Sequence, residues 1–248
     1  MGKLKGIVQF TGSFDNLSFY QLNGKIVVRR KGGFDGEKIK HQANYVRVRE
    51  NSSEFAHCAK TGKYFRMALI GLLQPLRIAY VHNHVVCLFQ KIITFDTVQT
   101  RGNRKVFTGL KTEHGHRAVL DFEFDKARSF GRFFPFKWFF DFENGHFSVF
   151  NFSTTSLKSP VGATHVRMQF HLIGLDFAGF TPPLLQSNDV VLVDLTSTED
   201  CLPSFSFIPI ISPFVFAVFE VQFLQEVNGD FKRLEGGGIK IVGVRSQN

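Results

Sequence analysis

The chain has 248 residues, of which 44% are hydrophobic and 21% are charged, and its formal net charge is +9. This balance is typical of a globular protein with a sizeable core, and it excludes a chain that is disordered along its whole length. Phenylalanine accounts for 31 residues, against four tyrosines and one tryptophan, so nearly all of the aromatic surface lacks a polar group.

Targeting signals and cysteine usage both favour a cytoplasmic protein. The N-terminal residues 1–6 are followed by no apolar segment, so we expect no secretory signal. The uncharged stretch 202–219 is interrupted by three prolines, which favours a buried strand pair over a membrane-spanning helix. Cys58, Cys87 and Cys201 are odd in number and far apart, which argues against a disulfide scaffold and a structural zinc site.

Residues 1–50 are predicted to form a β-hairpin followed by a basic arm. Asn23-Gly24 stands between the β-like runs 17–20 and 25–30, and Asn-Gly is a strong hairpin signal because both residues tolerate positive φ. A further strand is expected at 6–10 with a turn at 11–13, and the glycine-rich stretch 31–36 is expected to be an extended arm or loop.

Residues 51–97 are predicted to form a helical hairpin. Asn51 or Ser52 can cap a helix, and apolar residues then recur mostly at three- and four-residue spacing until Pro75. A similar spacing continues over 76–94, which predicts a second helix antiparallel to the first.

Residues 98–248 are predicted to form a Phe-rich domain of strands and loops, unless all three segments make one continuous domain. Asn144-Gly145 is predicted as a two-residue turn with Phe142 opposite Phe147, and Asn228-Gly229 as the turn of the last strand pair. Further strands are expected at 166–172, 190–195, 214–227 and 231–244. The predicted fold is mainly β (α+β), with a C-terminal antiparallel β-sandwich or barrel, an N-terminal β-hairpin, a basic arm and a helical hairpin.

Charge is distributed unevenly along the chain. Residues 1–117 contain 20 Lys/Arg and 7 Asp/Glu, whereas residues 118–248 contain 10 and 14. A basic half joined to an acidic half favours either a polyanionic partner or association between unlike surfaces of two copies. A polyanion such as nucleic acid would contact the basic residues of the first half, which are Arg29, Arg30, Lys31, Lys38, Lys40, Arg47 and Arg49.

Aromatic residues near 130–152 are predicted to occupy both faces of their strands. A strand that is apolar on both faces must be covered on both, by a second layer of its own chain or by another subunit. If another subunit covers them, the predicted contact residues are Phe34, Phe134, Phe136, Trp138, Phe139, Phe150 and Phe152.

Motifs of catalysis are absent from the sequence. It contains no G-x-S-x-G, H-E-x-x-H or P-loop pattern, so we expect the protein not to be an enzyme. Three carboxylates, Asp121, Glu123 and Asp125, alternate with phenylalanines, which is typical of the solvent-facing side of a strand. His114 and His116 could share a metal only on a loop or strand end, and surface imidazoles are the commoner case. We therefore expect no cofactor, no metal and no small-molecule substrate.

The N-terminal third and a short C-terminal stretch carry a likeness to a known family. The residues concerned are Lys5-Gly6, Gly12, Phe19-Tyr20, Arg30-Lys31-Gly32-Gly33, Arg49-Glu50-Asn51, Glu54-Phe55, Lys60, Gly62-Lys63, Arg66, Phe223 and Gln225-Glu226-Val227-Asn228-Gly229. This pattern resembles an uncharacterised family of proteins from the Bacteroidota. The resemblance implies a bacterial protein, and it brings no known activity and no catalytic residue with it.

These observations together predict a non-catalytic structural subunit. We expect it to assemble with itself into a homo-oligomer such as a tube, filament or shell, without a membrane. The alternative prediction is a nucleic-acid-binding protein that uses the basic N-terminal half.

Overall fold

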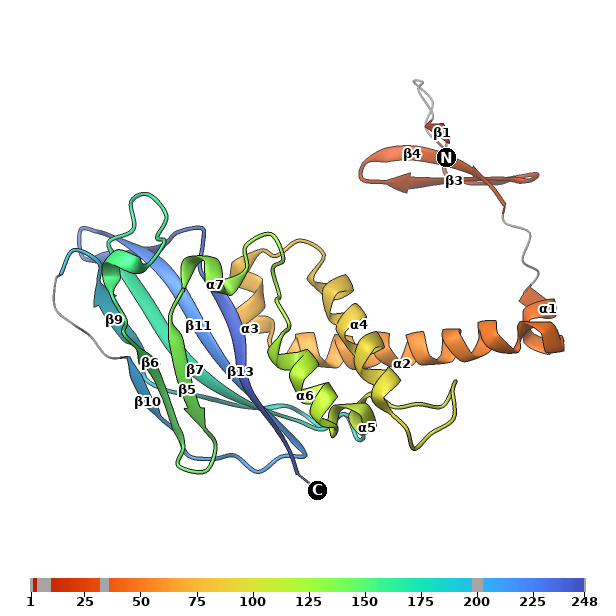
Figure 1. Ribbon diagram of the computed structural model, residues 1–248. Helices are drawn as coiled ribbons and strands as arrows, with labels where there is room; N and C mark the ends of the chain where they lie inside the picture. The colour runs from red at the N-terminus through yellow and green to blue at the C-terminus, as the bar shows by residue number, and fades with distance from the viewer. Residues whose placement is uncertain (1, 4–9, 32–35, 198–202, 248) are drawn as a thin grey trace. The chain divides into compact units, whose positions relative to one another are not determined.

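The structure is a computed structural model that describes residues 2–3, 10–31, 36–197 and 203–247. The chain divides into two compact units, residues 1–49 and 50–248. Figure 1 labels the elements of both units. The chain is α+β and rich in antiparallel strands, as the sequence predicts.

The first unit contains a small antiparallel sheet in the order β1-β4-β3-β2. Its strands are β1 (Gly2–Lys3), β2 (Gly12–Phe14), β3 (Leu17–Leu22) and β4 (Lys25–Arg30). The predicted Asn23-Gly24 turn is confirmed, because Leu22 pairs with Lys25 and both turn residues have positive φ. The predicted turn at 11–13 is wrong. That stretch enters β2, and the chain reverses after Phe14 at Asp15, which has a φ of 47°.

The helices of the first unit follow the sheet directly. They are α1 (Gly36–His41), η1 (Ala43–Tyr45) and the start of α2 (Val46–Ala68). α2 begins six residues before the predicted start at 52. The Arg49 guanidinium donates to the carbonyl oxygens of Ile39 (2.6 Å) and Gln42 (2.9 Å), so the first turns of α2 are tied to the end of α1. Of the predicted strand 6–10, residues 6–9 lie outside the described residues.

The helices of the second unit include two in the stretch predicted as a helical hairpin and others that the sequence analysis missed. They are α2, α3 (Ile70–Leu73), η2 (Gln74–Leu76), α4 (Val81–Ile92), η3 (Ile93–Phe95), α5 (Val106–Leu110), α6 (Glu113–Leu120) and α7 (Phe130–Phe133). The second helix begins at Val81 and not at 76, because Arg77 and Tyr80 have left-handed φ values of 49° and 56° that interrupt a helix.

The expectation of only strands and loops after residue 100 is wrong. Thr112 caps α6, since its Oγ1 accepts from the Gly115 N–H at 3.0 Å. Gly115 approaches Gly109 so closely that a Cβ there would lie 2.2 Å from the Gly109 carbonyl oxygen. A cap and a close glycine contact therefore stabilise a helix that is too short to show a clear period. Residues 121–125, predicted as a strand, form the loop that follows α6.

A six-stranded antiparallel sheet forms the centre of the second unit. Its strands are β7 (His165–Leu175), β8 (Leu184–Ser187), β9 (Val191–Asp194), β11 (Phe214–Val227), β12 (Asp230–Arg233) and β13 (Gly238–Ser246). β7 pairs with β11 along its whole length, and the predicted Asn228-Gly229 turn joins β11 to β12 as expected. The predicted strand 231–244 is two strands, because Gly236 and Gly237, with φ values of 119° and 74°, break it.

A second, smaller sheet packs on one face of the central one, in the order β10-β6-β5. Its strands are β5 (Lys137–Asp141), β6 (His146–Phe150) and β10 (Ser204–Ser206). The predicted hairpin register is wrong by two residues, because Phe147 pairs with Phe140 and not with Phe142. The Asp141 carboxylate accepts from the N–H groups of Glu143 (2.8 Å) and Asn144 (3.2 Å) and so holds a longer loop closed.

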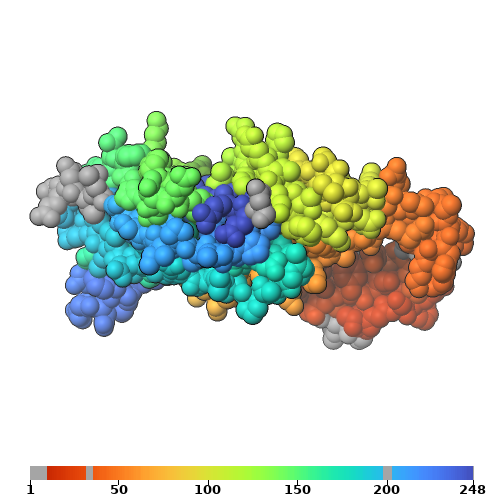
Figure 2. All heavy atoms as spheres, turned by 90° about the horizontal axis from the view of Figure 1, so that it is seen from below, coloured from red at the N-terminus to blue at the C-terminus, as the bar shows by residue number. Residues whose placement is uncertain are grey.

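Two hydrophobic cores lie on the two faces of the central sheet. In β11, Phe214, Phe216 and Val218 face the helices, whereas Val215, Ala217 and Phe219 face the smaller sheet. In Figure 1, β5 and β6 overlap β7 and β11 in the view, and α4, α5 and α6 lie to the right of β13. In Figure 2 the C-terminal strand, in dark blue, comes to the surface between the green β5–β6 region and the yellow-green α5–α6 region. The central sheet is thus covered twice by its own chain.

Candidate functional site

The aromatic residues predicted for subunit contact divide into a buried and an exposed group. Phe134, Phe136 and Phe152 are buried in the core between the two sheets, where Phe134 packs on Phe219 with ring centroids 5.3 Å apart. Trp138 is half-buried against the same core. Their cover is therefore the protein's own second layer.

Phe139 and Phe150 remain at the surface. They are 48% and 49% exposed, on the outer face of the smaller sheet. Phe139 pairs with Ser148 and Phe150 with Lys137, so the two rings are diagonal neighbours on that face. Asp141 follows on the same face, and hydrogen bonds from Asn144 and Glu143 lower the pKa of its carboxyl group. Phe34 lies outside the described residues.

The seven predicted polyanion-binding residues all lie in the first unit, and three of them make contacts within it. The Arg29 guanidinium lies 5.6 Å from the centroid of the Tyr20 ring. Lys40 forms a 2.8 Å ion pair with Glu37, and Arg49 binds the carbonyl groups described above. Arg30 lies on the opposite face of β4 from Arg29, Lys31 follows that strand, Lys38 lies in α1 and Arg47 in α2.

A surface that the sequence analysis missed lies on the small sheet of the first unit. We call it the N-terminal apolar face and define it by Phe10, Phe14, Leu17 and Phe19. Phe14 pairs with Leu17, Phe19 pairs with Gly12, and the rings of Phe10 and Phe19 lie 4.5 Å apart. Phe10 is 47%, Phe14 74% and Leu17 40% exposed. Phe10, Phe14 and Phe19 line an open cavity of about 410 Å³.

The signal for this face was the two-residue spacing of Phe10, Gly12 and Phe14, which was hidden by the assignment of 11–13 to a turn. Among residues of the first unit whose side chains are described, only Ile26 and Val27 are buried. A sheet of this size therefore leaves most of its apolar side chains in contact with water.

A group of hydrogen-bonded polar residues lies on the helix-facing side of the central sheet, beyond the end of the helical core. His171 Nδ1 lies 2.7 Å from Ser187 Oγ, and its Nε2 lies 3.4 Å from Glu220 Oε2. Gln222 donates to Glu220 and accepts from Arg167. Burial would raise the pKa of Glu220, but its contacts with His171 and Gln222 and the charge of Arg167 together lower it.

This polar group consists of a hydrogen-bonded chain inside the fold. Its order of serine, histidine and glutamate is that of a hydrolase triad, but the imidazole is only 3% exposed. Its signal in the sequence was the interruption of the apolar strand 214–227 by Glu220 and Gln222. The thiol of Cys58 is also unsuited to act as a nucleophile, because burial raises its pKa to about 12.

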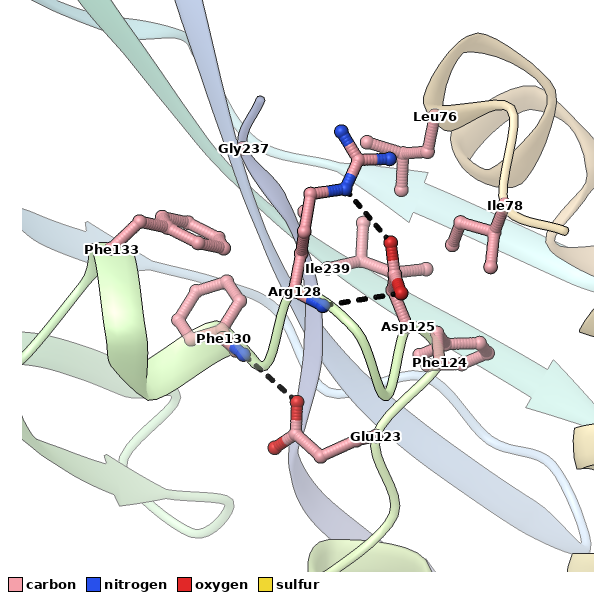
Figure 3. A pocket seen from close by; sticks show the side chains of 11 residues that line it. Leu76, Ile78, Glu123, Phe124, Asp125, Arg128, Phe130, Phe133, Gly237 and Ile239 are labelled. Carbon is pink, nitrogen blue, oxygen red and sulfur yellow. Dashed lines mark hydrogen bonds and ion pairs between the residues drawn. The ribbon is translucent and has the colours of Figure 1, made fainter. Parts of the chain in front are cut away.

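A small cavity separates the helical corner at η2 from the turn between β12 and β13 (Figure 3). Arg128 Nε lies 3.0 Å from Asp125 Oδ2, and the Phe130 N–H donates to Glu123 at 2.9 Å. Glu123 also pairs with Lys240 at 2.6 Å. The terminal nitrogens of Arg128 extend past the Asp125 carboxylate on the side of Leu76. The loop 121–129 is thus fixed by ion pairs, and one guanidinium points outward.

Histidines and cysteines form no metal site in the described part of the chain, where no three His, Cys, Asp or Glu residues are grouped to hold an ion. His114 and His116 lie on α6 and not on a loop or strand end. No helix of the described residues is both long and apolar enough to cross a bilayer. No family model matches the sequence, and neither a characterised protein nor a solved structure is significantly similar to it.

Proposed function

We propose that the protein is a structural subunit that assembles with further copies of itself through its N-terminal unit. The observation that carries this proposal is the N-terminal apolar face. Phe10, Phe14 and Leu17 expose large apolar surfaces on a sheet that buries only two described side chains. Complete burial of one such side chain against a neighbour stabilises by about 1.5–3 kcal/mol, so docking would favour assembly strongly.

The charges support a second copy as the partner of this face. Residues 1–49 contain 10 Lys/Arg and 3 Asp/Glu, whereas residues 118–248 contain 10 and 14. The outer face of the smaller sheet offers two exposed phenylalanines, Phe139 and Phe150, with Lys137 and Asp141 on the same face. An apolar surface in the basic unit of one copy would meet an apolar surface in the acidic part of the next. Contacts between unlike surfaces close into rings or extend as filaments.

The test is the size of the particles that the purified, nuclease-treated protein forms. We expect size exclusion with light scattering, and negative-stain microscopy, to show ordered particles far larger than the 28.2 kDa chain. The double variant Phe14→Ser, Leu17→Ser should elute as a monomer, since it removes apolar surface and no charge. The matched control is Val161→Ser, at a fully exposed position of the other unit. A monomeric wild type, or a double variant that still assembles, would refute the proposal.

Nucleic-acid binding is the second candidate, and one feature favours it. One face of the small sheet, opposite the N-terminal apolar face, carries Tyr20, Lys25 and Arg29. In the strand register, Tyr20 pairs with Val27, Ser18 with Arg29 and Leu22 with Lys25. A ring beside cationic side chains is suited to stacking on a base near its phosphate. Binding of a labelled oligonucleotide that weakens steeply with salt, by a protein that stays monomeric, would favour this candidate over assembly.

A further inference from the structure

A cleft in the second unit brings together three arginines that are far apart in the sequence. Its volume is about 640 Å³, which is in the range of small-molecule sites. One wall is η2 with the following Arg77, the other is the turn after β12, and Arg128 borders the cleft from the loop before α7. The lining residues are Gln74, Pro75, Leu76, Arg77, Arg128, Arg233, Leu234, Glu235 and Gly236.

Arg233 is the least accessible of the three arginines. Its Nη2 atom is buried and has no hydrogen-bond partner among the described residues. The nearby carboxylate, Glu220, is already engaged by Gln222 and His171. This nitrogen is closed off from the cleft as well as from acceptors of the chain, so an anion in the cleft would bind the rest of the Arg233 guanidinium.

The charges around Arg233 also favour an anion beside it. Burial lowers the pKa of Arg233, the negative charge of Glu220 raises it, and the positive charge of Arg167 lowers it further. Arg167 itself donates to Gln169 (2.6 Å) and Gln222 (3.3 Å), two neutral groups. Two guanidinium groups thus share the field of a single glutamate, and an anion beside Arg233 would relieve their repulsion.

Arg77 occupies a backbone conformation that is unusual for its residue type. It ends η2 with φ 49° and ψ 39°, in the left-handed region that glycine or asparagine usually fills. Non-glycine residues in this region concentrate at binding sites, where the surrounding structure holds them. Its side chain is exposed at the rim of the cleft.

Two carboxylates limit the positive charge of the cleft. Glu235 belongs to its lining, and Asp125 is the 3.0 Å partner of Arg128. The three guanidinium groups exceed the two carboxylates by one positive charge. Apolar side chains, those of Leu76, Leu234 and Pro75, form the rest of the lining together with Gln74 and Gly236. The lining therefore combines cationic groups for an anion with an apolar surface for carbon atoms.

We propose that this cleft binds a small organic phosphate, with the phosphate group between Arg233 and Arg77 and the organic part against Leu76 and Leu234. A phosphate offers several acceptor oxygens and up to two charges, which suits two guanidinium groups in one cleft better than a single carboxylate does. The volume exceeds the needs of one inorganic ion, which favours a phosphate attached to a larger molecule. This site lies entirely within the second unit and is independent of the proposed assembly.

Isothermal titration calorimetry at constant ionic strength tests the proposal on the full chain. The probes are adenosine monophosphate and glucose 6-phosphate, with inorganic phosphate and sodium sulfate as reference anions. We expect at least one organic phosphate to bind saturably and more tightly than either reference anion. A charge-assisted hydrogen bond corresponds to about tenfold or more in affinity, so Arg77→Gln and Arg233→Gln should each weaken binding by about tenfold.

The control variant is Arg132→Gln, an exposed arginine of α7 that does not line the cleft, and it should leave the affinity unchanged. Circular dichroism checks that each variant is folded; Arg77 is exposed, so its variant keeps the test valid if Arg233→Gln unfolds. Absence of saturable binding, equal affinity for inorganic phosphate, or affinity unchanged in Arg77→Gln would overturn the proposal.

Discussion

The two compact units of the chain cover their phenylalanines to different extents. In the second unit, Phe65 and Phe219 are 1% and 0% exposed, each inside one of the two cores that flank the central sheet. In the first unit, Phe10 and Phe14 are 47% and 74% exposed. A sheet buries its aromatic residues only where another layer covers it, so the same residue type stabilises one unit and leaves the other ready to dock.

The largest expected loss of stability comes from removing a buried phenylalanine ring from either core of the second unit. The Phe65 ring lies within 6.5 Å, centroid to centroid, of the rings of Phe89, Phe124, Phe177 and Phe216. Phe65→Ala and Phe219→Ala should each lower the free energy of unfolding by about 3–5 kcal/mol, because each leaves a cavity.

Phe14→Ala is the matched control in the first unit and should change the free energy of unfolding by less than about 0.5 kcal/mol. Urea unfolding followed by circular dichroism measures all three variants under conditions that keep them monomeric. A large loss in Phe14→Ala would mean that its ring is buried in the free chain, against the comparison drawn here.

Ion pairs also differ in burial between the two units, and we expect a smaller effect on stability from them. Glu54 and Arg104 in the second unit form two 2.7 Å contacts, and their side chains are 11% and 20% exposed. Glu54→Gln leaves the guanidinium with a neutral partner, so the loss of stability should approach the roughly 3 kcal/mol of a broken buried pair.

The corresponding pair of the first unit, Lys40 with Glu37, is exposed on both sides at 66% and 70%. Glu37→Gln should therefore change stability by no more than about 0.5 kcal/mol, because water screens exposed charges. Thermal unfolding at low and high salt compares the two variants. Equal effects of the two substitutions would contradict the difference in burial.

The smallest of the three expected effects is a dependence of stability on pH. The Nε2 atom of His57 accepts the Val106 N–H at 3.1 Å, at the start of α5. Burial lowers the pKa of His57, and the charges of Lys105 and Lys60 lower it further. Below pH 6.5, the ordinary value, the unfolded chain therefore binds a proton that the folded chain excludes, and stability falls as the pH falls.

The slope from this one histidine is at most about 1.4 kcal/mol per pH unit. His57→Gln keeps an acceptor for the Val106 N–H and removes the proton, so it should flatten the stability curve between pH 6.5 and the lowered pKa. His41→Gln, at an exposed position of the first unit, is the control and should leave the slope unchanged. Urea unfolding at a series of pH values decides between these outcomes, and an equal slope in His57→Gln would refute the assignment.

Local signals predicted well those parts of the fold that depend on local backbone chemistry. Strand 214–227 was predicted with the bounds that β11 has, because large apolar residues recur along it at the two-residue spacing of a strand. Turns 23–24 and 228–229 were predicted because Asn-Gly tolerates the positive φ values found there. The hairpin that joins β5 to β6 was predicted in the wrong register, because the Asp141 side chain selects a longer loop than Asn144-Gly145 alone would form.

None of the arginine cleft was predictable from the sequence. Arg77, Arg128 and Arg233 belong to three separate elements, and no spacing in the chain relates them. Their approach depends on how η2 and the turn before β13 pack, and packing is a property of the folded chain. The N-terminal apolar face could have been predicted from the sequence, since it follows from a two-residue spacing within one hairpin.

The sequence by itself determined that this is a β-rich, Phe-rich protein with Asn-Gly hairpins and a basic first half, because periodicity, turn sterics and charge are local properties. Only the tertiary structure decided which phenylalanines are covered. Phe134 and Phe139 are five residues apart, yet one is fully buried and the other is 48% exposed. The difference is set by the layer that packs against each strand face, and contacts distant in sequence create that layer.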